Sequence, residues 1–296
     1  MSASGAASGA DKRYRGRFAP SPTGLLHAGS LAAGMASWLD ARAHDGVWIV
    51  RIEDIDPPRE VEGASEAILH ALDVFGMVSD EPVIWQHDRH EAYEAALVGL
   101  ASKNRVYGCS CSRKEARAAA LALGLPENVY PGTCRGTPWN EGRAVRFFVG
   151  PGTVSFTDRW TGPYSQDVEH EVGDFVVRRA DGLWAYQLAV VVDDLFSGVN
   201  HVVRGGDMLE NTPRQIRLIE ALGGEAPRYM HVPLVLNDRG EKLSKQQGAR
   251  PLDLSDPLGE LERAFVHLGF PALGADSIDA FWKAAVPLWR ERFPGL

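Results

Sequence analysis

The chain alternates between short apolar segments and longer segments with helical spacing, and this alternation restricts the fold more than any other feature. A strand-like run at 13–21 (RYRGRFAPS) precedes a helical run at 25–44. A buried strand at 47–54 (VWIVRIED) then precedes a second helical run at 58–76, which ends at Gly76. Strand, helix, strand and helix at this spacing predict a doubly wound, parallel, Rossmann-like α/β sheet.

The pattern changes twice more along the chain. Cysteines, loops and a β-rich run (AVRFFVGPGTVSFTDRW) interrupt it, and it resumes with LWAYQLAVVVDDLFSGVNHVVRGGD. The first residues are small and polar. We therefore predict a disordered tail at 1–13, the first half of a catalytic α/β domain at 14–88, an insertion at 89–179, the second half of the domain at 180–250, and a short helical tail at 251–296.

Composition narrows the class of protein. The 296 residues are 45% hydrophobic and 24% charged, which is ordinary for a soluble globular chain. No apolar run is long enough to span a bilayer, and the N-terminus lacks the apolar stretch of a secretory signal, so we expect a cytoplasmic protein without membrane contact. The net charge of −8 argues against a general nucleic-acid binder but allows a local basic patch.

The stretch RFAPSPTGLLHAGS, residues 17–30, joins the first strand to the first helix. Ligands of open parallel sheets bind outside the carboxyl ends of the strands, and free N–H groups at a helix start favour an anion. His27 can donate to a phosphate, and Gly29 permits close approach of a ligand. The alternative is a proline-rich loop whose histidine caps the helix.

A second stretch, RGEKLSKQQGA at 239–249, follows the last buried strand. It carries Lys242 and Lys245, two of only six lysines in the chain. A lysine-bearing loop suits transient neutralisation of charge on a transferring phosphate. The alternative is a solvated surface loop.

Together these stretches resemble the class I aminoacyl-tRNA synthetases, and the glutamyl branch most closely. The segments RFAPSPTGLLHAG, RIEDIDPPRE, VVRGGDMLENTPRQI and KLSKQQGA resemble that branch in the right order, over roughly 14–250. IEDIDPPRE and LAVVVDD resemble in particular its truncated paralogues, the glutamyl-Q tRNA(Asp) synthetase family. We accordingly expect no anticodon-binding domain. The chain departs from many class I enzymes with Leu243 in place of methionine and Gln246 in place of serine.

Candidate glutamate-binding residues follow from the chemistry of the amino acid. Arg17 and Arg204, each at the end of a predicted strand, suit bidentate recognition of carboxylates. Glu53 can accept the ammonium, and Ser21 and Tyr186 supply neutral hydrogen bonds. The resemblance places the glutamate contacts at the same five positions. The alternatives are a surface arginine at Arg17, a surface ion pair at Glu53 and a core tyrosine at Tyr186.

The resemblance implies ATP-dependent activation of L-glutamate to glutamyl-adenylate without tRNA, and transfer to queuosine in the anticodon loop of tRNA(Asp). It implies catalytic roles for His27, Lys245 and, more weakly, Lys242, with His27, Gly29 and Lys245 binding ATP. We expect Mg²⁺ to accompany ATP, and a monomer.

Two alternative functions stay open at this point. One is a glutamyl-tRNA synthetase acting on the acceptor end of tRNA(Glu), and the other is a non-enzymatic tRNA-binding paralogue. The lysine loop and the pair Glu53 and Arg204 argue against the latter, because a binding module does not need them.

All three cysteines, Cys109, Cys111 and Cys134, fall in the predicted insertion and suggest one structural Zn²⁺. Such a site usually has four ligands, and no histidine lies between 90 and 170. The residues leave the fourth ligand open among Tyr130, Glu115 and Glu127. The resemblance favours Tyr130, because the glutamyl-Q family has a tyrosine in the pattern Y-x₃-C. The alternative is three buried free cysteines.

Overall fold

The computed structural model describes residues 13–236 and 250–295. Its strands are β1 (Arg15–Phe18), β2 (Val47–Ile52), β3 (Ile84–Trp85), β4 (Val106–Cys109), β5 (Ala144–Phe147), β6 (Thr153–Asp158), β7 (Gly162–Asp167), β8 (Phe175–Arg178), β9 (His201–Gly205) and β10 (Arg228–Val232). Its α-helices are α1 (Ala28–Ala43), α2 (Ala64–Val74), α3 (His90–Ser102), α4 (Arg113–Ala122), α5 (Val168–Glu171), α6 (Tyr186–Phe196), α7 (Thr212–Leu222), α8 (Pro257–His267) and α9 (Ile278–Arg292).

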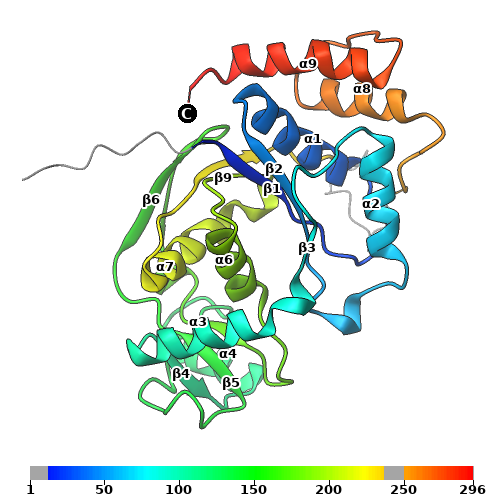
Figure 1. The fold of residues 1–296 in the computed structure, drawn as a ribbon. Coiled ribbons are helices and arrows are strands. Elements are labelled where there is room, and N and C mark those ends of the chain that lie inside the picture. The colour runs from blue at the N-terminus through cyan, green and yellow to red at the C-terminus, as the bar shows by residue number, and fades with distance from the viewer. Residues whose placement is uncertain (1–12, 237–249, 296) are drawn as a thin grey trace, which may run out of the picture.

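The central strands are parallel, as predicted. β1 pairs with β2, β2 with β3, and β9 with β10, all in parallel register. β9 lies beside β1, where the N–H of Asn200 donates to the carbonyl of Arg15 at 3.0 Å. The three-stranded sheet β1-β2-β3 and the two-stranded sheet β9-β10 therefore meet at β1 and β9, two segments nearly 190 residues apart, in the middle of the molecule (Figure 1).

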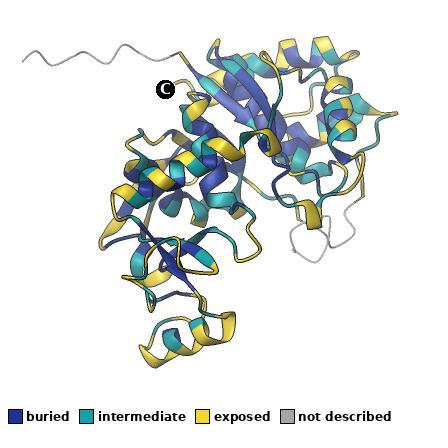
Figure 2. Cartoon of the chain, turned by 60° about the horizontal axis from the view of Figure 1, so that its bottom comes forward, coloured by how far each residue is buried: buried dark blue, intermediate teal, exposed yellow. Residues whose placement is uncertain are grey.

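Alternate residues of these strands face two different apolar layers. Trp48 and Val50 of β2 pack in the core formed with α1, α2, α8 and α9, whereas Ile49 packs in the core formed with α3, α6 and α7. Val203 and Val202 of β9 divide in the same way. The strands are thus buried on both faces, which Figure 2 shows as dark blue strands between helices that are exposed on their outer sides.

The second helix is shorter than the predicted run at 58–76. Residues Pro57–Arg59 form a single 3₁₀ turn, and Gly63 has a left-handed backbone with φ of 74°. That conformation favours glycine and interrupts the helical pattern, so α2 begins only at Ala64. Gly76 also has a positive φ, 70°, and ends the helix as predicted.

The residues between the two halves of the sheet form antiparallel structure. β4, β5 and β8 make one sheet, and β6 and β7 make a hairpin. The hairpin returns to the central sheet, where the N–H of Arg159 donates to the carbonyl of Tyr229 at 2.9 Å and its guanidinium pairs with buried Asp40. The boundaries of an insertion at 89 and 179 stay a prediction.

The C-terminal helices cover α1, as Figure 1 shows at the top of the molecule. Trp289 of α9 is fully buried and donates from Nε1 to Asp40 Oδ1 at 2.9 Å, and Trp282 donates to the carbonyl of Phe75. The polar groups of these indoles are therefore satisfied in the core. Among the described helices, none combines the length and the apolar character that crossing a membrane requires.

Candidate active site

The structure brings the five candidate glutamate-binding residues to one pocket of about 340 Å³. Arg17, Ser21, Glu53, Tyr186 and Arg204 all line it. Their role in binding glutamate stays a prediction. The structure itself shows that these residues come together from distant parts of the chain.

Strand topology explains the convergence. Arg17 lies near the carboxyl end of β1, Glu53 follows β2 directly, and Arg204 lies near the carboxyl end of β9. The helix after β1 packs on one face of the sheet and the helix after β9 on the other. The crevice between β1 and β9 is therefore a topological switch point, where open α/β sheets bind their ligands.

A buried ion-pair network fixes the first arginine. Arg17 is 3% exposed, so the alternative of a surface arginine is wrong. Its Nε donates to Asp194 Oδ1 at 3.2 Å, and Arg51 donates to the same oxygen at 2.7 Å. Burial alone would raise the pKa of Asp194, but the two guanidinium groups hold it below its usual value. Arg17 is thus anchored through Nε while its side chain lines the pocket.

Glu53 forms a buried ion pair, so the alternative of a surface ion pair is wrong in its location. Its Oε1 lies 3.3 Å from Nη2 of Arg51, and the residue is 7% exposed. Burial raises the pKa of Glu53 above its ordinary value, although Arg51 and Arg17 oppose the shift. An ammonium entering the pocket would stabilise the ionised carboxylate and offset part of that burial cost.

Tyr186, the first residue of α6, is half-buried at the pocket wall. Burial of its hydroxyl, followed by the charge of Glu53, raises the pKa of the phenol. The hydroxyl therefore stays protonated and can donate a hydrogen bond to a ligand.

Arg204 is held by neutral partners instead of a carboxylate. Its Nε donates to His231 Nε2 at 3.0 Å and its Nη2 donates to Thr212 Oγ1 at 2.8 Å. His231 in turn donates from Nδ1 to Asp158 Oδ2 at 2.7 Å. Burial lowers the pKa of His231, so the ring is neutral and its Nε2 is an acceptor. The positive charge of Arg204 is thus positioned without being neutralised by its direct partners.

His27 caps the N-terminus of α1. Its Nδ1 accepts from the N–H groups of Gly29 and Ser30 at 3.1 and 3.3 Å. The expectation that these N–H groups are free for an anion is therefore wrong, and the capping alternative describes the local geometry. Because Nδ1 accepts, the proton of the neutral ring is on Nε2, which is the atom able to donate to a phosphate.

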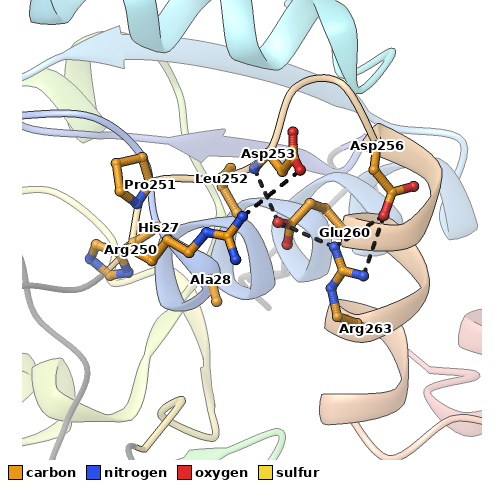
Figure 3. A pocket seen from close by; sticks show the side chains of 9 residues that line it. All are labelled: His27, Ala28, Arg250, Pro251, Leu252, Asp253, Asp256, Glu260 and Arg263. Carbon is orange, nitrogen blue, oxygen red and sulfur yellow. Dashed lines mark hydrogen bonds and ion pairs between the residues drawn. The ribbon is translucent and has the colours of Figure 1, made fainter.

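A second pocket, of about 520 Å³, opens beside His27 (Figure 3). It lies between the start of α1 and the segment from Arg250 to Arg263, where Arg263 pairs with Asp256 and Glu260. A smaller cavity of about 140 Å³, lined by His27, Gly29 and Ala33, lies between this pocket and the first one. Ala33 lines both the small cavity and the 340 Å³ pocket, so the three hollows follow one another along the sheet edge. Lys242 and Lys245 lie outside the described residues.

The three cysteines form one cluster with Tyr130. Their sulfur atoms all lie within 4.8 Å of one another, and the Tyr130 hydroxyl lies 3.4 Å from Cys109 Sγ and 3.5 Å from Cys111 Sγ. Glu115 instead accepts from Ser112 in a capping box, and Glu127 pairs with Arg117. The two glutamates therefore point to other partners, and the geometry favours Tyr130 among the three candidates for a fourth ligand.

The donor set of this cluster fits zinc, which prefers four ligands with sulfur prominent among them. Burial would raise the pKa of Cys134, but the hydrogen bonds from Tyr130 and Cys111 lower it to about 7. The guanidinium of Arg146 lies 3.7 Å from the centre of the Tyr130 ring and donates to Cys109 Sγ at 3.3 Å. The lowered pKa of Cys134 favours the thiolate form that binds metal, whereas burial raises the pKa of Cys111. Cys109 is buried, whereas Cys111 and Cys134 are partly exposed, so the alternative of three buried cysteines is wrong in its burial.

Sequence reasoning missed the residues that support the pocket: Arg51, Asp158, Asp194 and His231. Two features of the sequence indicated part of this network: the two aspartates at the end of LAVVVDD and the arginine inside VWIVRIED. Charged residues in apolar runs are buried only when they are paired, so these residues could have been expected to have charged partners. His231 and Asp158 carried no comparable signal, since each is a single polar residue at a strand end.

Comparisons of the sequence and the fold with known proteins all lead to the tRNA synthetases. A family model described as the catalytic domain of class I tRNA synthetases (E and Q) matches residues 13–266. A protein named glutamyl-Q tRNA(Asp) synthetase from Burkholderia cenocepacia is 54% identical over 95% of this chain and 97% of its own length. The chain belongs to this family. A protein of the same name from Bordetella bronchiseptica is 52% identical over 95% of this chain and 90% of its own.

Among solved structures, the glutamate-tRNA synthetase of Elizabethkingia anophelis is similar, with a TM-score of 0.70 and 30% identity. The match covers 80% of this chain and 53% of that longer chain. Membership of the glutamyl-Q family makes the chain a class I synthetase-like ligase, as predicted.

Proposed function

We propose that this ligase converts L-glutamate and ATP to glutamyl-adenylate without tRNA, and transfers the glutamate to queuosine in the anticodon loop of tRNA(Asp). One observation carries the proposal: two buried guanidinium groups and one buried carboxylate line a single pocket at the switch point of the sheet. Glutamate, with two carboxylates and one ammonium, is complementary to that set of charges.

In the activation step, Arg17 and Arg204 bind the carboxylates and Glu53 the ammonium. A carboxylate oxygen of glutamate attacks the α-phosphorus of ATP, the bond from that phosphorus to the bridging oxygen breaks, and pyrophosphate leaves. His27, at the other end of the row of hollows, donates to the phosphates through Nε2, and Gly29, which has no side chain, lets the nucleotide approach the start of α1 closely. Lys245, and more weakly Lys242, neutralise charge in the transition state, and Mg²⁺ accompanies the nucleotide.

In the transfer step, a hydroxyl oxygen of the acceptor attacks the acyl carbon of the adenylate. An ester bond forms, the bond between the acyl carbon and the phosphate oxygen breaks, and AMP leaves with the electron pair. The hydroxyl proton passes to the departing phosphate or to water. These steps need no covalent contribution from the protein, so alignment and electrostatics supply the catalysis.

We assign zinc a structural role. Cys109, Cys111, Cys134 and Tyr130 would hold one ion, which cross-links β4 to the loop after α4 and supplies no reacting atom. Its site belongs to the same antiparallel region as β5 and β8.

The deciding experiment measures transfer of labelled glutamate to tRNA(Asp) with queuosine, to tRNA(Asp) without it, and to tRNA(Glu). Each tRNA is tested with its 3′-terminal adenosine present and with that nucleotide removed. We expect charging of queuosine-bearing tRNA(Asp) alone, and we expect that charging to persist without the 3′ adenosine. Efficient charging of tRNA(Glu), abolished by removing its 3′ adenosine, would instead identify an ordinary glutamyl-tRNA synthetase.

A further inference from the structure

A side pocket of about 160 Å³ adjoins the glutamate pocket. The two share four wall residues: Ser21, Glu53, Arg59 and Tyr186. At about 30 Å³ for each water molecule, the side pocket has room for roughly five waters, or for one small ring. A group bound there lies next to whatever occupies the glutamate pocket.

Gln86 lines this side pocket and carries a buried acceptor without a partner among the described residues. The residue is 0% exposed, lines the pocket, and donates from Nε2 to Asp193 Oδ2 at 2.8 Å. Asp193 also accepts from Arg89 and Tyr93, at 2.5 and 2.7 Å. A carboxylate in such a network only accepts, so the amide nitrogen of Gln86 must face it and Oε1 must face away. Within the described part of the chain, that buried oxygen has no hydrogen-bond partner.

Glu60 presents a second acceptor of the same kind. Its Oε1 is buried and has no partner among the described residues, and the residue lines the same pocket. Two buried acceptors without donors destabilise the fold unless a ligand or water satisfies them. The site is therefore built for a group that donates hydrogen bonds.

The remaining walls exclude an anion and supply an apolar surface. Three carboxylates line the pocket, from Glu53, Asp56 and Glu60, against the two guanidinium groups of Arg59 and Arg179. Asp56 is paired with both arginines, at 2.5 and 3.2 Å. This excess of negative charge disfavours a phosphate, so the pocket does not suit the nucleotide.

Trp184 completes the wall. Its Nε1 donates to His90 Nδ1 at 2.9 Å, and the guanidinium of Arg178 lies 4.9 Å from the ring centre. The indole is thus fixed in orientation and offers the pocket ring carbons, which suit the flat face or edge of another ring.

We infer that the side pocket holds the hydroxyl-bearing ring of the nucleoside that accepts glutamate, with Gln86 Oε1 and Glu60 Oε1 accepting from its hydroxyl or amino groups. The inference rests on the proposed function, since it needs an acceptor that carries donors. It goes further by assigning the recognition to two residues outside the glutamate pocket. A ring held there lies next to the glutamate pocket, with which the side pocket shares four wall residues.

The test compares Gln86→Met and Glu60→Met with Glu62→Met as a matched control. Glu62 is exposed, stands two residues from Glu60 and does not line the pocket. For each protein, the Michaelis constant for tRNA in glutamate transfer is divided by that for glutamate in ATP–pyrophosphate exchange. The tRNA is the one that the wild-type enzyme charges.

We expect this ratio to rise about three- to tenfold for each pocket variant and to stay at the wild-type value for Glu62→Met, as loss of one hydrogen bond predicts. Glu60 lies at the surface side of the pocket, so its variant gives a result even where Gln86→Met fails to fold. An unchanged ratio in Glu60→Met, or an equal loss of exchange and transfer, would overturn the inference. Absence of glutamate-dependent exchange in the wild-type protein would overturn the proposed function itself.

Discussion

The side chains of the glutamate pocket and those of the cysteine cluster are held in place in different ways. The pocket draws its side chains from β1, β2, α6 and β9, and every charge in it already has a protein partner or a fixed neighbour. The cluster draws its four candidate ligands from residues 109–134, and its sulfur atoms face one another around a common centre. The pocket is therefore preorganised by the fold, whereas the cluster depends on what binds between its thiols.

We therefore expect the pocket to determine ligand binding and the cluster to determine local folding. A preorganised pocket can select glutamate without conformational change, because its arginines are held before the ligand arrives. A thiol cluster without metal loses the interaction that would hold its loops, since metal-binding energy in such sites is folding energy. Damage to the two regions should accordingly appear in different measurements.

The largest effect is expected from breaking the cluster. Cys109→Ser should lower zinc from about one ion per chain to well below that value, and expose residues 109–134 to proteolysis. The Michaelis constant for glutamate should stay near that of wild type, because the cluster contributes no residue to the pocket. Elemental analysis and limited proteolysis check this, with Ser110→Ala at a neighbouring exposed position as the control.

Retention of zinc by Cys109→Ser would show that the cluster is not the metal site. A large loss of glutamate affinity in this variant would show that the two regions are coupled.

Removing the buried arginine that supports the pocket should have the next largest effect. Arg51 is fully buried and pairs with Asp194 and Glu53, so Arg51→Met leaves buried carboxylates without a counter-charge. We expect a loss of about 3–5 kcal/mol in the free energy of unfolding, measured by denaturant titration. The exposed Arg263, replaced in the same way, should cost far less. A stability loss as small as that of the Arg263 variant would contradict the preorganised network.

The sheet that carries the pocket should also weaken as the pH falls. Burial lowers the pKa of His201 on β9 from 6.5 to about 4. The unfolded chain therefore binds a proton at this residue near pH 6.5 while the folded chain does not, so stability decreases as the pH falls from about 6.5 to about 4. The loss is on the order of 3 kcal/mol.

His201→Phe keeps an aromatic ring against Tyr14, which stacks on His201 at 4.3 Å, and removes the titration. The slope of unfolding free energy against pH between 6.5 and 4 should therefore be smaller in this variant. An identical slope in wild type and variant would assign the pH dependence to other groups.

The smallest effect tests how the pocket holds Arg204. In His231→Asn, the amide N–H can still donate to Asp158, but the acceptor for Arg204 Nε is lost. The Michaelis constant for glutamate in exchange should rise about three- to tenfold with little change in kcat, as expected for one hydrogen bond. His231→Gln, whose amide oxygen reaches further, should recover part of this loss. A fall in kcat with an unchanged Michaelis constant would place His231 elsewhere in the reaction.

The sequence predicted the parallel α/β sheet and the neighbourhood of the five pocket residues, because periodicity and strand ends are local properties of the chain. Arg17 and Arg204 each lie one residue before the end of a strand, and the topology of parallel strands then brings them together. The cysteine cluster was predictable for a similar reason, since its members are close in sequence.

The supporting network could not be predicted in the same way. Arg51 meets Asp194 across 143 residues, and His231 meets Asp158 across 73, and no spacing rule specifies such pairs. The capping role of His27 was one of the two sequence-based alternatives, but the choice between them depended on local geometry. The late start of α2 depended on the left-handed backbone of a single residue, Gly63. These details arise from packing and hydrogen-bond satisfaction, which a periodic pattern does not encode.

The central claim is that the pocket is complementary to glutamate before any tRNA binds. ATP–pyrophosphate exchange, measured without tRNA for glutamate and glutamine at equal concentrations, tests it most directly. The account predicts exchange with glutamate and little with glutamine, because the amide would leave a buried guanidinium without its carboxylate. Equal exchange with the two amino acids, or exchange that appears only when tRNA is added, would contradict it.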